Sequence, residues 1–218
     1  MFIIKILGIV GSRRKDGNTS ALVQRAVKAA EEEGVQAEII FLGDYVIKDC
    51  TGCEGCKDTY KCVINDDMQK LYPRLLEADA IILGSPTYFY NVSAAVKAFI
   101  DRCYCFEVFA KDDRSIWMGI YEALGGKYAV VMAVCEQSSK ADMGNTIEAM
   151  TKSLEALGYR VIDTLQALGL FKKQDVLNNE KILDQAAKAG KKLAKTLKLR
   201  KEIEEKLHSI DSIKNNEI

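Results

Sequence analysis

The chain has 218 residues, and its 31 lysines and arginines balance its 31 aspartates and glutamates. Hydrophobic residues make up 48% of the chain and charged residues 28%, a composition typical of globular proteins. The zero net charge gives no bulk electrostatic reason to expect a nucleic-acid or membrane partner. Seven cysteines stand beside a single histidine, His208, near the C-terminus. Catalysis by a Ser-His-Asp triad or by His-ligated zinc is therefore not expected.

The first ten residues are apolar, but the positive charges Arg13, Arg14 and Lys15 follow them. A signal peptide places its positive charge before the apolar stretch. No segment approaches the roughly 20 apolar residues that span a bilayer. We expect a cytoplasmic protein whose cysteines are reduced or bound to a metal centre.

Apolar runs and amphipathic segments alternate along the chain. The predicted elements, in chain order, are a strand over 3–10, a polar loop over 12–17, a helix over 18–34, a strand over 35–42, an irregular cysteine-rich stretch over 43–64, a helix over 66–79, a strand over 80–84, a helix over 93–103, a surface excursion over 106–126, a strand over 127–134, a helix over 142–157, a strand over 160–165 and a helix from 174 to about 208. Strands interleaved with helices predict an α/β fold, with a parallel sheet covered by helices on both faces.

We predict one domain over residues 1–170 and a helical extension of it over residues 171–218. Apolar residues recur in the extension every three or four positions, at Leu199, Ile203, Leu207, Ile210 and Ile213. This spacing fits a solvated helix face with a few apolar residues, or a stripe that packs between subunits.

The loop after the first strand has the composition of an anion site. In open α/β sheets the first strand-to-helix turn binds anions, because unpaired N–H groups and the helix dipole favour negative charge there. Gly17 allows a tight turn, and neither a Walker A sequence nor G-x-G-x-x-G is present, which favours a single terminal phosphate. The alternative is an ordinary capped turn. The polar and basic residues of this loop are Ser12, Arg13, Arg14, Lys15, Asn18, Thr19 and Ser20.

The loop after the third strand is aromatic. It reads Pro86-Thr87-Tyr88-Phe89-Tyr90-Asn91, and in the strand order 2-1-3-4-5 it faces the anion loop across the sheet's switch point. Three consecutive aromatic residues are costly to leave in water, so they are expected to cover a flat ligand or to pack in an interface. The alternative is that these aromatic residues cover the hydrophobic core and bind no ligand.

Together these segments resemble the NADPH-dependent FMN reductase family of flavodoxin-like proteins. The motifs are Gly11-Ser12-x-Arg14 with Gly17-Asn18-Thr19, and Ser85-Pro86-x-Tyr88 leading to Lys97-x-Phe99-x-Asp101-Arg102. The resemblance covers roughly residues 1–170 and implies a flavodoxin-like five-stranded sheet. It implies that the FMN phosphate is held by Ser12, Arg14, Asn18, Thr19 and Ser20, and that the ring is lined by Pro86, Thr87, Tyr88 and Phe89 and touched by Cys135, Glu136 and Gln137. Arg13, Gly17 and Asn91 complete the predicted cofactor-binding set.

Four cysteines form a C-x2-C-x2-C-x5-C run, namely Cys50, Cys53, Cys56 and Cys62. Three thiolates at this spacing can surround a small inorganic centre, and because no second run exists Cys62 is expected to close the same site. Gly52 and Gly55 leave room for backbone amides to point at sulfur. We predict a [4Fe–4S] cluster in the loop 48–64. Zinc, disulfides and unligated cysteines are the alternatives, and Cys103, Cys105 and Cys135 fit no ligand spacing.

With a cluster, the chain resembles the iron–sulfur flavoproteins of anaerobic archaea and bacteria. The resemblance implies an electron-transfer flavoprotein that links a ferredoxin-like or NAD(P)H donor to a small-molecule or protein acceptor. It also implies a homodimer or homotetramer in which a cluster faces the flavin of a neighbouring subunit. A cluster-free NAD(P)H-dependent FMN or quinone reductase and a non-catalytic flavin-binding sensor are the two alternatives.

Overall fold

The computed structural model describes residues 3–214 and the side chains of residues 3–207. The side chains of His208, Ile210 and Ile213 lie outside this range. The strands are β1 (Lys5–Val10), β2 (Gln36–Phe41), β3 (Ala80–Tyr88), β4 (Asn91–Val92), β5 (Glu107–Phe109), β6 (Trp117–Gly119), β7 (Lys127–Val134) and β8 (Tyr159–Ala167). The α-helices are α1 (Asn18–Glu31), α2 (Met68–Glu77), α3 (Ala94–Arg102), α4 (Ile120–Ala123), α5 (Thr146–Ala156) and α6 (Glu180–Lys214).

The central sheet is parallel and has the order β2-β1-β3-β7-β8. Counted as the five predicted strands, this is the order 2-1-3-4-5, so the predicted fold class is confirmed. At the middle of β1, Gly8 pairs with Ile39 on one side and Ile82 on the other. The inner strands β1, β3 and β7 are apolar runs buried on both faces over most of their length, as is typical of parallel sheets.

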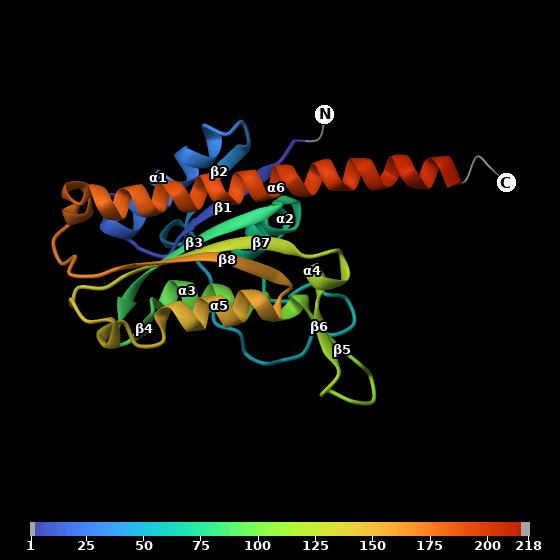
Figure 1. The fold of residues 1–218 in the computed structure, drawn as a ribbon. Helices are drawn as coiled ribbons and strands as arrows, with labels where there is room; N and C mark the ends of the chain where they lie inside the picture. Colours follow the sequence, from blue (N-terminus) through green and yellow to red (C-terminus); the bar gives the residue numbers. More distant parts are fainter. Residues whose placement is uncertain (1–2, 215–218) are drawn as a thin grey trace.

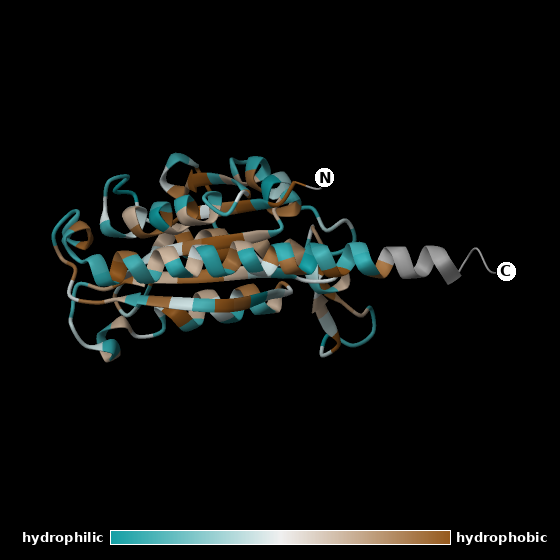
Figure 2. Cartoon of the chain, turned by 45° about the horizontal axis from the view of Figure 1, so that its top comes forward, coloured by the Kyte–Doolittle hydropathy of each residue, from teal (hydrophilic) through white to brown (hydrophobic). Residues whose placement is uncertain are grey.

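Helices cover both faces of this sheet (Figure 1). On one face α1 and α6 pack over a core that includes Val23, Val27 and Leu193. On the other, α2, α3 and α5 pack over a core that includes Leu71, Phe99 and Met150. In Figure 2, apolar strands lie beneath a largely hydrophilic α6. The amphipathic faces of these helices are what the periodicity of the sequence predicted.

Two segments depart from the predicted elements. β3 continues to Tyr88 and turns at once into β4, so the aromatic residues occupy a strand end and a tight hairpin rather than a loop. Within the excursion 106–126, β5 and β6 form a separate antiparallel hairpin that projects from the body (Figure 1). Its strands have three residues each, which is too short to give a recognisable alternation in the sequence.

The C-terminal helix α6 has 35 residues and runs past the end of the sheet (Figure 1). Its first half packs along α1, where Gly190 allows the two backbones to approach closely. Among the described residues no helix, α6 included, combines the length and the apolar character that a membrane span needs.

Candidate functional site

The turn between β1 and α1 leaves the N-terminus of α1 without a side-chain cap. Gly17 occupies the N-cap position in an extended conformation, and its N–H donates to the carbonyl of Arg14 at 2.9 Å. The first turn of α1 contains no acidic residue. The first N–H groups of the helix and its dipole therefore favour an anion at this point.

This turn forms one wall of a cleft at the carboxyl edge of the sheet, where β1, β3, β7 and β8 end. The lining residues are Ser12, Arg14, Gly17, Asn18, Thr19, Pro86, Thr87, Tyr88, Val134, Glu136, Leu170, Phe171 and Lys173. The hydroxyl of Thr87 is buried in this wall and has no hydrogen-bond partner in the described chain. A buried orphan hydroxyl beside an uncapped helix N-terminus suits a ligand with both heterocyclic polar atoms and a phosphate.

Basic and acidic groups surround the anion end of the cleft. Lys173 forms an ion pair with Asp16, and this contact lowers the pKa of the Asp16 carboxyl. Lys15 pairs with Asp44 at 2.8 Å on the far side of the loop. Of the predicted basic residues, Arg14 is the one that lines the cleft.

Asn18 lines the cleft, and its side-chain amide also bonds backbone groups of the segment after β8. Its Nδ2 donates to the carbonyls of Lys172 (2.9 Å) and Leu170 (3.4 Å), and its Oδ1 accepts from the N–H of Val176 (3.1 Å). The Asn18 amide thus fixes the 170–176 segment over the start of α1. This segment carries Phe171 and Lys173, which form the outer wall of the cleft.

Six predicted cofactor-binding residues do not line the cleft, and Gln137, after the end of β7, is one of them. Arg13 lies along Gly43, and Ser20 is buried in α1, where its hydroxyl accepts from Gln24 at 3.0 Å. Phe89 is 98% exposed in the hairpin turn. The side-chain Oδ1 of Asn91 accepts from the neighbouring Val92 N–H, and Cys135 is buried just after the end of β7.

Four cleft residues were not predicted from the sequence, namely Val134, Leu170, Phe171 and Lys173. Val134 ends β7, and the other three follow β8, so all four lie where strands of a parallel sheet end. The rule that ligands bind at carboxyl ends of strands applies to the fourth and fifth strands as well as the first and third. Applied to all of them, it would have pointed to these residues.

The loop of residues 48–64, here called the cysteine loop, contains four unpaired thiols. Cys53 is exposed, and Cys50, Cys56 and Cys62 are partly buried. A hydrogen bond from the backbone N–H of Gly55 is the largest influence that lowers the pKa of the Cys53 thiol. Burial raises the pKa of the Cys56 thiol, and repulsion from Cys62, Cys50 and Cys53 adds to this rise.

The thiols do not converge on one point. Between residues 3 and 207, no three His, Cys, Asp or Glu side chains are arranged to hold a single metal ion. A tetrahedral zinc site needs such convergence. Gly52 has a φ of +64°, a conformation that lets this loop turn around its centre.

Helix α3 connects the cleft to the cysteine loop. At its start, the Ser93 hydroxyl donates to the carbonyl of Gly11 at 2.8 Å, and the Ser93 N–H donates to Ser85 at 3.0 Å. At its end, Arg102 contacts Lys48 and Ile64, the two ends of the cysteine loop. With nine residues, α3 is about 13 Å long, and this length separates its two ends.

Several curated proteins are similar in sequence to part of this chain. The chain is 48% identical over 99 residues to an iron–sulfur flavoprotein of Methanocaldococcus jannaschii, a match that covers 45% of this chain and 51% of the relative. An iron–sulfur flavoprotein of Archaeoglobus fulgidus is 36% identical over 159 residues, which covers 73% of this chain and 71% of the relative. In the first three relatives the matched part spans about half of their length.

Solved structures share the fold at low identity. A flavone reductase superposes with a TM-score of 0.67 at 20% identity, over 89% of this chain and 63% of that one. An archaeal flavodoxin superposes with a TM-score of 0.54 at 18% identity, over 89% and 99% of the two chains. The family model for NADPH-dependent FMN reductases matches residues 4–171, which contain the sheet, most of the cleft and the whole cysteine loop. The chain therefore belongs to the NADPH-dependent FMN reductase family.

Proposed function

We propose that the protein is an electron-transfer flavoprotein that holds FMN in the cleft and a [4Fe–4S] cluster on the cysteine loop. It would pass electrons between a one-electron donor such as a ferredoxin and a small-molecule or protein acceptor, in the cytoplasm. The relatives named iron–sulfur flavoproteins support this proposal, as do the cleft and the thiols of the chain itself.

For FMN, the groups present match what the ligand offers. The N–H groups at the start of α1, with the hydroxyls of Ser12 and Thr19 and the charge of Arg14, would hold the phosphate. The orphan hydroxyl of Thr87 would bond a polar atom of the ring, and Tyr88 would flank it. Phe171 and Lys173 would close the outer side of the site.

For the cluster, the ligands would be Cys50, Cys53, Cys56 and Cys62. Their thiols are unpaired, their loop turns at a positive-φ glycine, and the Gly55 N–H already points at the Cys53 sulfur. When bound, FMN exchanges one or two electrons and the cluster exchanges one. The polypeptide then has to bind, orient and insulate these groups, and it needs no histidine acid or base.

The observation that carries the proposal is that one helix, α3, joins the cleft at the uncapped start of α1 to a loop of four unpaired thiols. The test is anaerobic purification followed by iron, acid-labile sulfide and flavin assays. About four irons, about four sulfides and about one FMN per chain are expected. A protein with flavin but without sulfide would refute the cluster.

An NAD(P)H-dependent FMN or quinone reductase is the second candidate, and the family to which the chain belongs favours it. Stopped-flow mixing with NAD(P)H separates the two. A ferredoxin-linked carrier is reduced slowly or not at all by pyridine nucleotide, whereas a reductase is reduced within its turnover time.

A further inference from the structure

A buried ion pair joins Arg102, the last residue of α3, to Asp66, which lies two residues before α2 and next to the cysteine loop. Arg102 and Asp66 have side chains that are 0% and 2% exposed. The contact is bidentate, with Nη1 to Oδ2 at 2.5 Å and Nη2 to Oδ1 at 3.1 Å. Burial disfavours the guanidinium charge, but Asp66 and the sulfur of Cys62 outweigh it and raise the pKa of Arg102. The arginine is therefore a fixed positive charge in the interior.

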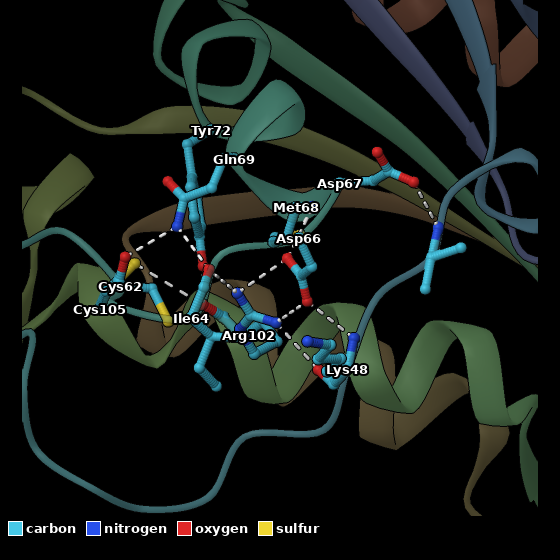
Figure 3. A network of polar contacts seen from close by, with 11 residues as sticks. Lys48, Cys62, Ile64, Asp66, Asp67, Met68, Gln69, Tyr72, Arg102 and Cys105 are labelled. Carbon is cyan, nitrogen blue, oxygen red and sulfur yellow. Dashed lines mark hydrogen bonds and ion pairs between the residues drawn. The ribbon is translucent and has the colours of Figure 1, made fainter.

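The pair holds both ends of the cysteine loop (Figure 3). At the entry, Arg102 donates to the Lys48 carbonyl at 3.0 Å, and Asp66 accepts from the Lys48 N–H at 2.8 Å. At the exit, Arg102 donates to the Ile64 carbonyl at 3.3 Å. Gln69 adds bonds of 2.8 Å to the carbonyls of Ile64 and Cys62. The loop is thus closed at its base by one buried pair of side chains.

One donor of the guanidinium is unused. Arg102 Nε is buried and has no hydrogen-bond partner within the described part of the chain. The guanidinium charge interacts electrostatically with Cys62 and Cys53, which are two of the four proposed cluster ligands. Buried N–H groups are rarely left without an acceptor. A metal-bound thiolate is a good acceptor, whereas the sulfur of a free thiol is a weak one.

We propose that Arg102 is a positioning residue of the cluster, which closes the cysteine loop through its Nη atoms and donates its Nε–H to the Cys62 sulfur. This inference rests on the proposed function. A hydrogen bond and a buried positive charge at a ligand sulfur stabilise the reduced cluster, which carries one more negative charge. Arg102 therefore raises the reduction potential of the cluster, and Asp66 partly offsets that effect.

The decisive variant replaces both members of the pair, Arg102→Met with Asp66→Asn, so that no buried charge is left unpaired. We expect it to keep FMN and the cluster, counted as flavin, iron and sulfide. Its cluster should be harder to reduce, with about tenfold less reduced cluster at a fixed potential, which is about 59 mV for a one-electron couple. Anaerobic redox titration followed by electron paramagnetic resonance measures this. Asp66→Asn alone should shift the potential in the opposite direction, because it leaves the guanidinium charge unbalanced.

Two controls separate this effect from loosening of the loop. Gln69→Ala removes the hydrogen bonds to the backbone carbonyls of Cys62 and Ile64 and leaves every sulfur atom without a changed neighbour charge. Hydrogen exchange in the cysteine loop should therefore become faster, while the reduction potential of the cluster should not change. Arg114→Met removes an exposed arginine that contacts Glu54 of the same loop at 2.7 Å, and screening should leave the potential unchanged.

The outcomes are distinct. An unchanged potential in the double variant, or an equal shift in Gln69→Ala, overturns the role of Arg102 and leaves the proposed function intact. A wild-type protein without iron and sulfide overturns the proposed function, and this inference falls with it. If the double variant does not fold, Asp66→Asn decides: a higher potential supports the inference, and an unchanged or lower one overturns it.

Discussion

Two aromatic residues hold a backbone conformation that aromatic residues rarely adopt. Phe89 and Tyr90 form the two-residue turn between β3 and β4, with φ values of 45° and 63°. Such turns favour asparagine and glycine, because a side chain in the left-handed region costs roughly 1–2 kcal/mol. The Tyr90 carbonyl accepts from the Asn145 N–H at 2.8 Å, which helps to keep the turn in place.

Phe89→Asn should therefore stabilise the protein. Phe89 is 98% exposed, so the substitution removes little packing, and we expect the free energy of unfolding to rise by about 1 kcal/mol. Urea denaturation measures it. Ile116→Asn, at another exposed apolar residue (61%) with an ordinary φ, is the control and should change stability by less than about 0.5 kcal/mol. A loss of stability in Phe89→Asn would show that the ring makes contacts worth more than the turn strain.

At the residue scale, strand-end position predicts which residues reach the cleft, but not what each side chain contacts. Ser12, Arg14, Gly17, Thr19 and Thr87 line it because they follow β1 or end β3. The side chain of Asn18 instead bonds a segment more than 150 residues further on. That pairing depends on where α6 begins, and no local pattern contains it. The same holds for the Arg102–Asp66 pair, which joins the end of α3 to the segment that precedes α2.

At the scale of elements, the contact between α1 and α6 depends on one glycine. A Cβ on Gly190 would lie 1.9 Å from the carbonyl oxygen of Ala26. An alanine in a helix is normally better than glycine by about 1 kcal/mol, but here backbone would have to move. We expect Gly190→Ala to lower the free energy of unfolding by about 1–3 kcal/mol. Gln185→Ala on the exposed side of α6 is the control, and a stabilised Gly190→Ala would contradict the close packing.

The start of β7 carries a lysine that is held against α2. Lys127 donates to the carbonyls of Leu75 and Leu76, and burial lowers its pKa from 10.5 to about 8. Between pH 8 and 10.5 Lys127 has lost its proton in the folded protein and has kept it in the unfolded chain. The contribution of Lys127 to the free energy of unfolding therefore rises with pH over this range.

Comparison with Lys127→Met tests this effect. The difference in free energy of unfolding, wild type minus variant, should increase as pH is raised through the window from 8 to 10.5. Taking the difference cancels titrations that both proteins share. A difference that is flat or falls over this range would mean that the lysine keeps its ordinary pKa in the folded state.

Element boundaries follow from the sequence where apolar periodicity is long. The five strands of the main sheet and the helices between them lie close to their predicted ranges. β3 ends four residues later than predicted, because Pro86 and Thr87 continue the strand although a proline usually ends one. Pro86 still lies in register with Val134 of β7.

At the scale of the whole molecule, the cleft and the cysteine loop lie at opposite ends of α3. Within one chain a cluster on that loop is remote from the phosphate end of the cleft. A homodimer or homotetramer, in which each cluster approaches the flavin of a neighbour, would remove that separation. The overhanging part of α6 offers a surface for it, since Leu199, Ile203 and Leu207 are exposed at four-residue spacing.

Leu199→Glu with Ile203→Glu should therefore weaken self-association. Each apolar side chain buried between subunits contributes roughly 1.5–3 kcal/mol, so the double variant should sediment as a smaller species than the wild type at the same concentration. Leu177→Glu is the matched control, because Leu177 is 51% exposed but lies outside this stripe. A wild-type protein that sediments as a monomer at all concentrations would contradict the proposal, and so would an unchanged double variant.

The closure of the cysteine loop at its base has a consequence for how such a chain can vary. Since Lys48 and Ile64 are tied to the same buried pair, the chain leaves the flavodoxin-like body and returns to it at nearly one place. The segment between them can change in length or composition without shifting the register of any strand. A change within that segment therefore leaves in place the strand ends that line the cleft.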